Sequence, residues 1–188
     1  TILTTYATDI YGAPLIAALG IASFPYNYIA TFIARGVFSV IGTFLGGILA
    51  VVFGGKRTML VGIAGGGVLA YIYFTLLPHM ASVPDGYAYV LTLASLTEFV
   101  QYWGYGAMAV FATEIFTTKW RYSGVGYSFQ LGALIYGLTS SVFTVSLISM
   151  AHGLAHVTPY FNEATVIVSV VGLVATALLR KRGKSDIE

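Results

Sequence analysis

The sequence predicts an all-α bundle of membrane-spanning helices. Of its 188 residues, 57 % are apolar and only 9 % are Asp, Glu, Lys or Arg, against roughly 25 % charged residues in an ordinary soluble domain. Five stretches are long and apolar enough to cross a bilayer, and the basic residues gather on one side of them. So few charges cannot cover the surface of a soluble globule, which excludes a soluble enzyme, a nucleic-acid-binding protein and a disordered chain.

The spans follow one another along the chain. A helix needs about 20 mainly apolar residues to cross ~30 Å of hydrocarbon. Charged residues, Gly and Pro interrupt residues 1–24, which we interpret as the end of a preceding membrane helix and its exit turn. Five transmembrane helices are then expected within residues 25–179, at about 26–53, 59–77, 87–113, 125–151 and 160–179. Residues 180–188 form a basic tail, and because the chain begins inside apolar sequence, we expect it to be the C-terminal part of a longer protein.

The basic residues predict the orientation of these helices. Cytoplasmic loops of membrane proteins carry an excess of Lys and Arg. All but one of the nine basic residues lie in alternate turns or in the tail, on a single side of the predicted spans: Lys56, Arg57, Lys119, Arg121, Arg180, Lys181, Arg182 and Lys184. We therefore expect this side and the C-terminus to be cytoplasmic. The expected location is the cell (plasma) membrane.

Two charged residues inside the spans, Arg35 and Glu98, are the first candidates for a functional site. A charge near the bilayer centre costs ~3 kcal/mol or more, so each side chain should face protein or water. Both lie about ten residues from the outer end of their helix, or roughly 15 Å deep. We expect them to be partners, directly or through substrate and water. The alternative is a static ion pair that only fixes the register of the helices.

Other polar residues extend this candidate site. Tyr102 shares a helical face with Glu98, and Gln130 and Tyr136 are the strongest candidates in the fourth span. The second and fifth spans are expected to be nearly free of polar stripes. In the second span, Gly62 and Gly66 have the G-x-x-x-G spacing that allows close helix packing.

Histidine spacing gives a weak indication of metal binding. His152 and His156 are four residues apart, a spacing that can bind zinc on a helix, but no metal-binding carboxylate motif accompanies them. The chain has no cysteine to supply a thiolate ligand or a nucleophile. We therefore predict no metal and no cofactor, and treat a membrane enzyme that uses these histidines as a minor alternative.

Two loops carry recognisable patterns. Between the third and fourth spans, the chain reads ATEIFTTKWRYSG from residue 112 to residue 124, with Glu114, Phe116, Arg121 and Gly124 at defined spacing. Between the first and second spans it reads GILAVVFGGK from residue 47 to residue 56, ending in Gly54, Gly55 and Lys56. These patterns resemble the loops between helices ten and eleven and between helices eight and nine of major facilitator superfamily transporters. The Arg-Tyr-Ser-Gly form is similar to that of the metabolite:proton symporter branch.

The chain departs from the family pattern at three positions. Thr117 stands where the family has a proline, and Val51 and Val52 stand where it has Asp and Arg. The resemblance implies that the spans are helices eight to twelve of a major facilitator fold, whose N-terminal half is a missing partner. It also implies that Gly54, Lys56, Glu114, Arg121 and Gly124 form cytoplasmic gate loops, in which Glu114 can pair with Arg121 or Lys119.

The function implied by the resemblance is secondary active transport, not enzymatic catalysis. The substrate would be a small metabolite, such as an organic acid or a zwitterion, moved by alternating access and driven by protons. Arg35, Glu98, Tyr102, Gln130 and Tyr136 are the expected substrate or coupling residues. Membrane lipid is the other expected partner. The main alternative is a membrane scaffold or receptor that transports nothing.

Overall fold

A computed structural model shows the arrangement of the chain and describes residues 15–21, 26–117, 119–150, 152 and 156–179. All regular elements among these residues are helical, which confirms the predicted all-α class. They are α2 (Tyr26–Phe53), α3 (Gly55–Leu76), the 3₁₀ helix η1 (Leu77–Ser82), α4 (Gly86–Ile115), α5 (Arg121–Met150) and α6 (Thr158–Leu178). Residues 1–14, which belong to the predicted end of a preceding helix and its exit turn, and the predicted basic tail 180–188 lie outside the described residues.

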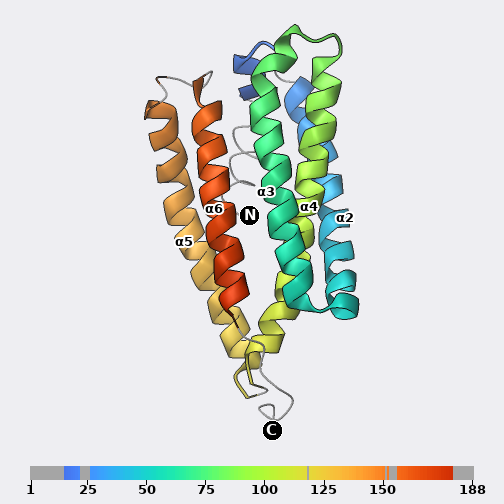
Figure 1. Cartoon of the computed structure of the whole chain (residues 1–188), viewed down its shortest axis with the longest axis vertical. Helices are drawn as coiled ribbons and strands as arrows, with labels where there is room; N and C mark the ends of the chain where they lie inside the picture. The colour runs from blue at the N-terminus through green and yellow to red at the C-terminus, as the bar shows by residue number, and fades with distance from the viewer. Residues whose placement is uncertain (1–14, 22–25, 118, 151, 153–155, 180–188) are drawn as a thin grey trace.

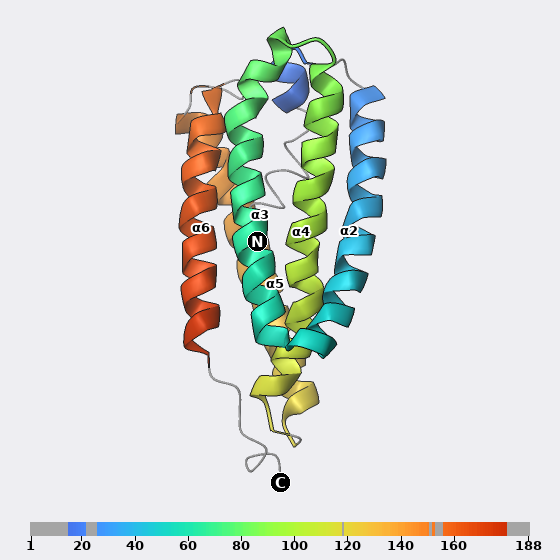
Figure 2. The same ribbon diagram turned by 45° about the vertical axis from the view of Figure 1, so that its right-hand side comes forward.

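The long helices stand upright in one bundle (Figure 1). The turn from α2 to α3 and the connection from α4 to α5 lie at its lower end, and η1 lies at its upper end. Figure 2 shows α6, α3, α4 and α2 side by side in this order, and these neighbours pack against one another. Because α2 and α4 both run downward, they are parallel, whereas α3 runs upward between α4 and α6. Among the described residues, α5 packs on the bundle mainly through α4.

Glycines set the close packing of α2, α3 and α4. A Cβ atom added to Gly46 of α2 would lie 2.7 Å from the backbone Cα and carbonyl carbon of Trp103 in α4. One added to Gly62 of α3 would lie 2.5 Å from the Cα atom of Gly104, and one on Gly66 would lie 2.7 Å from the Cγ atom of Gln101. Side chains at these positions would force the helices apart, so the predicted packing role of Gly62 and Gly66 is confirmed.

An apolar core closes the upper end of the bundle. The segment 15–21 lies there, and its Leu15 and Ile16 are fully buried. They pack with side chains from α3, η1, α4 and α6 in a cluster that comprises Tyr73, Phe74, Leu77, Val90, Ala94, Val157 and Phe161. The rings of Phe74 and Phe161 lie 5.2 Å apart and join α3 to α6.

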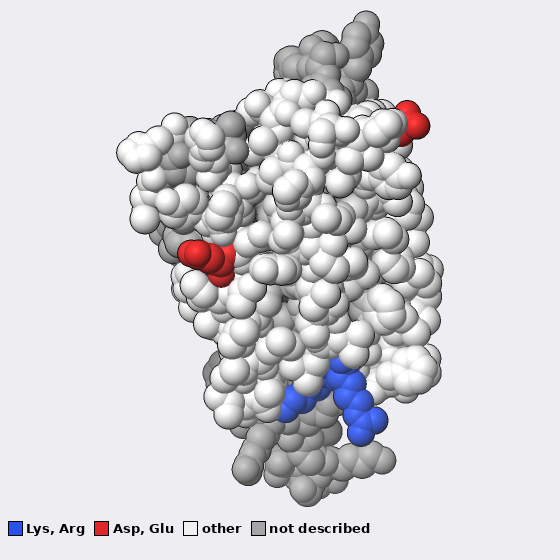
Figure 3. Space-filling view, turned by 45° about the horizontal axis from the view of Figure 1, so that its top comes forward, with Lys and Arg blue, Asp and Glu red and all other residues white. Residues whose placement is uncertain are grey.

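The outer surface is suited to lipid. Within the described residues, three helices are long and apolar enough to cross a membrane: Ile33–Phe53, Gly55–Ser82, which includes η1, and Thr158–Leu178. They expose large apolar side chains, such as Phe44 of α2 and Val171 of α6. Figure 3 shows Lys and Arg atoms at the lower end of the surface, with a wide uncharged area above them. A soluble protein rarely exposes so large an apolar surface, so these features indicate a membrane protein.

The fifth predicted span, now α6, is not free of a polar stripe, and this expectation is wrong. The face that α6 buries against the bundle carries Thr158, Thr165, Ser169 and Thr176. The Ser169 side chain lies close enough to Gly67 of α3 that a Cβ atom there would clash with it. Small hydroxyl side chains allow two helices to approach closely in the same way as glycine does.

Candidate functional site

Arg35 and Glu98 form an ion pair in the interior of the bundle. The Nη2 atom of Arg35, on α2, donates a hydrogen bond to the Oε1 atom of Glu98, on α4. The two side chains are 5 % and 1 % exposed. The predicted partnership is therefore confirmed as a direct contact between side chains of two parallel helices.

The glycine contacts bring the backbones of α2 and α4 together below the ion pair. Gly42 lies against the backbone of Phe99, and Gly46 lies one turn further down against Trp103. Gly106 in turn lies against the backbone of Thr43, so both helices contribute glycines to the interface. This packing fixes the height of α2 relative to α4, and with it the positions from which Arg35 and Glu98 reach each other.

Tyr73 of α3 is a third polar residue at this place, and the sequence reasoning missed it. Its side chain is 1 % exposed, and it is close enough to interact electrostatically with both Arg35 and Glu98. No described residue forms a hydrogen bond with its hydroxyl group. The sequence did contain an indication of this residue. Seven residues after Gly66, on a helix without internal charge, it has a tyrosine where a phenylalanine would have a similar shape but lack the hydroxyl group.

The neighbouring polar side chains of α4 are buried too. Ser95 donates to the carbonyl oxygen of Leu91 at 2.8 Å, and Thr97 donates to that of Leu93 at 2.7 Å. Both hydroxyl groups thus bond within their own helix, which is the usual arrangement for Ser and Thr in a helix interior. Gln101 is 1 % exposed and lies one turn below Glu98.

The remaining predicted substrate or coupling residues lie away from the ion pair or outside the described part. Tyr102, half-buried on α4, packs its ring against Tyr105 at 5.8 Å, and Tyr105 contacts Phe129 of α5 at 5.7 Å. Gln130 is exposed on α5, and the side chain of Tyr136 lies outside the described residues. The structure therefore brings Arg35 and Glu98 together but does not bring Gln130 to them.

At the lower end of the bundle, Glu114 holds the start of α3. Its Oε1 atom accepts a hydrogen bond of 3.3 Å from the backbone N–H of Gly55, the first residue of α3. A carboxylate is favourable here because a helix N-terminus carries partial positive charge. Gly54, just before the helix, has a φ of 93°, which only glycine adopts without strain. The predicted pairing of Glu114 with Arg121 or Lys119 stays a prediction.

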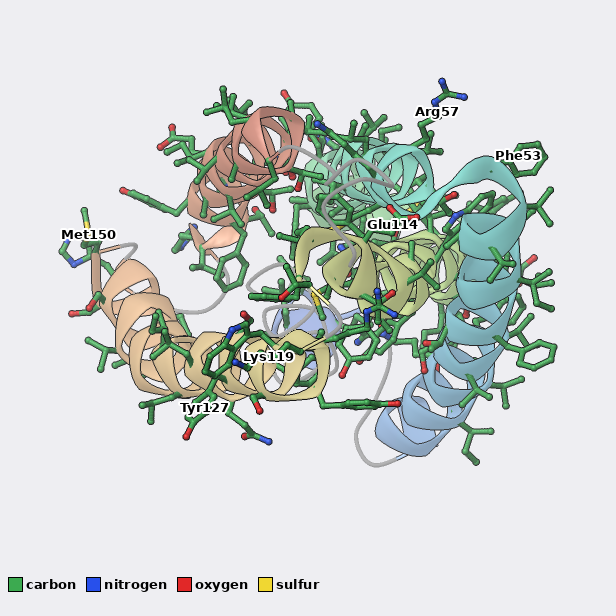
Figure 4. All side chains as sticks on the ribbon, turned by 90° about the horizontal axis from the view of Figure 1, so that it is seen from below. Phe53, Arg57, Glu114, Lys119, Tyr127 and Met150 are labelled. Carbon is green, nitrogen blue, oxygen red and sulfur yellow. The ribbon has the colours of Figure 1, made fainter. Side chains whose placement is uncertain are left out.

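Lys56 links α3 to α6. Its ammonium group donates to the carbonyl oxygens of Ala177 at 2.7 Å and Leu179 at 2.6 Å. These are carbonyl groups at the C-terminal end of α6, which attracts positive charge. Arg57, the next residue, points away from the bundle, as Figure 4 shows from below. The two adjacent basic residues thus have different surroundings.

The loop between α4 and α5 closes on itself through Phe116 and Gly124. The ring of Phe116 lies against Gly124, so that a Cβ atom there would be 2.5 Å from the Cδ1 atom of the ring. The N–H group of Gly124 donates to the carbonyl oxygen of Trp120 at 2.7 Å. The spacing of these two motif residues therefore has a local packing reason.

Among the described residues, no three His, Cys, Asp or Glu side chains come together as a possible metal site. Comparison of the chain with models of protein families, with curated proteins and with solved structures finds no match.

Proposed function

We propose that the chain is part of a secondary active transporter of the major facilitator type, which moves a small metabolite by alternating access and is driven by protons. The observation that carries this proposal is the buried ion pair of Arg35 and Glu98. Burying two opposite charges costs several kcal/mol per ion, and a well-packed apolar pair of similar volume is often as stable or more stable. Ionisable residues within membrane helices commonly mark substrate and ion pathways.

The proposed mechanism is an exchange of partners at this ion pair. A substrate carboxylate, from an organic acid or a zwitterion, binds the guanidinium group of Arg35 and releases Glu98. The released carboxyl group takes up a proton, because an unpaired charge is costly in the interior of the bundle. Release of the substrate and the proton on the other side restores the ion pair. Tyr102, Gln130 and Tyr136 are then contacts made in other states of the cycle.

The proposed architecture makes α2 to α6 five transmembrane helices, corresponding to helices eight to twelve of the fold. The basic lower end and the C-terminus face the cytoplasm of a cell whose plasma membrane holds the protein. The gate loops lie there, with Gly54, Lys56, Glu114, Arg121 and Gly124. The N-terminal half of the same transporter supplies the other wall of the substrate pathway. Gln130 supports this arrangement, since it is a polar side chain exposed on α5 and is not suited to face lipid.

The experiment uses the full-length protein reconstituted in liposomes. Counterflow and proton-driven accumulation are measured with radiolabelled monocarboxylates, dicarboxylates and amino acids. We expect Glu98→Gln to retain counterflow of the transported compound but to lose its accumulation against a gradient. The control is Glu163→Gln, since Glu163 is exposed on α6. Full accumulation by the Glu98→Gln variant would contradict the proposal.

A membrane scaffold or receptor is the second candidate function. The direct contact between Arg35 and Glu98 is compatible with this function, because such a contact can fix the register of the helices without taking part in transport. Replacing both residues with Gln distinguishes the two functions. If the double variant folds stably but no longer transports, the ion pair takes part in transport. If the native protein transports none of the labelled compounds, the scaffold or receptor function is supported.

A further inference from the structure

The Tyr73 hydroxyl group is a buried polar group that the ion pair does not use. The side chain belongs to the apolar core at the upper end of the bundle, together with Phe74 and Leu77. Phenylalanine would fill the same space in that core, and leaving a buried hydroxyl group without a hydrogen bond is costly. The hydroxyl group therefore has a role that this arrangement of Arg35 and Glu98 does not reveal.

The register of α3 against α4 directs Tyr73 toward Glu98. Gly66 lies against Gln101, and Tyr73 lies two turns above Gly66 on the same buried face of α3. Glu98 lies about one turn above Gln101, so Tyr73 is level with the residues about one turn above Glu98. Side chains lean toward the N-terminus of their helix. Since α3 and α4 are antiparallel, Tyr73 leans down and Glu98 leans up, and the two side chains converge.

We propose that Tyr73 is the alternate hydrogen-bond partner of Glu98, which binds the carboxyl group when Arg35 releases it. A phenolic hydroxyl group both donates and accepts. It can therefore bond to the carboxylate and to the protonated carboxyl group. Tyr73 then acts as a positioning residue for Glu98 in the state that lacks the ion pair. Its importance for transport rests on the proposed function, but the exchange of partners does not.

A thermal double-mutant cycle tests the exchange without any substrate. The melting temperature of the purified protein in detergent is measured with Tyr73→Phe in two backgrounds, native and Arg35→Met. With Arg35 present, removal of the hydroxyl group leaves the melting temperature unchanged or raises it, because no hydrogen bond is lost and a buried hydroxyl group without a hydrogen bond is costly. With Arg35 removed, it lowers the melting temperature by roughly 2–6 °C, since the hydrogen bond between Tyr73 and Glu98 is then lost.

Two further variants keep this cycle interpretable. Tyr71→Phe is the matched control, because Tyr71 is 46 % exposed on the same helix and should have no effect in either background. If Arg35→Met does not fold, Arg35→Gln serves as the second background, since it also removes the positive charge that pairs with Glu98. Equal effects of Tyr73→Phe in the native and the Arg35-substituted background would overturn the proposal, because independent sites add.

Transport by the full-length protein adds a second readout. Tyr73→Phe should lower the turnover number about tenfold and leave KM unchanged, because the hydrogen bond that Tyr73 gives Glu98 during the exchange is lost. An unchanged turnover number would overturn the role of Tyr73 in the transport cycle. Failure of the native protein to transport would overturn the proposed function alone, because the melting cycle needs no substrate.

Discussion

Gly46→Ala should separate α2 from α4 and destabilise the fold. The added Cβ atom would lie 2.7 Å from the Cα atom and from the carbonyl carbon of Trp103, whereas ordinary contact begins at 3.4 Å. The helices must therefore part by at least 0.7 Å (3.4 − 2.7), because the blocking atoms are backbone atoms that no rotamer change can move. Overpacking of this kind costs about 1–3 kcal/mol, and the higher helix propensity of alanine offsets up to about 1 kcal/mol of it.

Because the clash is with backbone atoms, the upper end of the overpacking cost applies, and the net loss of about 2 kcal/mol (3 − 1) corresponds to a melting temperature lower by about 4–8 °C. Thermal unfolding in detergent, followed by tryptophan fluorescence, measures this change. Gly47→Ala is the control, since the nearest atom to its Cβ position is the carbonyl oxygen of Gly106 at 4.0 Å. That variant should melt at the native temperature or slightly above it. Equal melting temperatures for the two variants would refute the idea that backbone contact at Gly46 holds α2 to α4.

Two further predictions concern the lower end of the bundle. Lys56→Ala removes both hydrogen bonds to the end of α6 and should lower the free energy of unfolding by about 0.5–1 kcal/mol. The control, Arg57→Ala, should leave the free energy of unfolding unchanged. Equal melting temperatures for these two variants would contradict the role of Lys56 in linking α3 to α6. Gly54→Ala forces a side chain onto a backbone with φ 93° and ψ 137°, a conformation that is almost confined to glycine, and should cost about 1–3 kcal/mol. Gly36→Ala, where nothing lies within 4 Å of the Cβ position, should not destabilise in the same melting assay.

The sequence was most informative where a residue differs in polarity or size from the apolar residues around it. Arg35 and Glu98 each interrupt a long apolar run. A charge within a membrane helix is costly unless it has a partner, so their pairing was predictable. Gly62 and Gly66 were predictable for a related reason, because glycine in a long helix implies close packing. The helical class follows from the same long apolar runs.

Residues that do not interrupt the pattern were harder to interpret. Tyr73 occupies an apolar position, and its hydroxyl group leaves the hydrophobic period of α3 unchanged. The stripe on α6 consists of Thr and Ser, whose hydroxyl groups can bond to their own helix and add little polarity. The exposure of Gln130 could not be predicted either, because it depends on how α5 packs against the other helices, which no local pattern specifies.

The glycine contacts bear on which role of the ion pair is favoured. A purely structural pair would have to fix the register of α2 against α4. Gly42, Gly46 and Gly106 already hold the two backbones in contact, and a shift along the helix axis would drive side chains into them. An ion pair adds little to a register that is set in this way, while it costs the desolvation of two charges. The proposed role in binding or proton transfer therefore explains that cost better than a role in fixing the register.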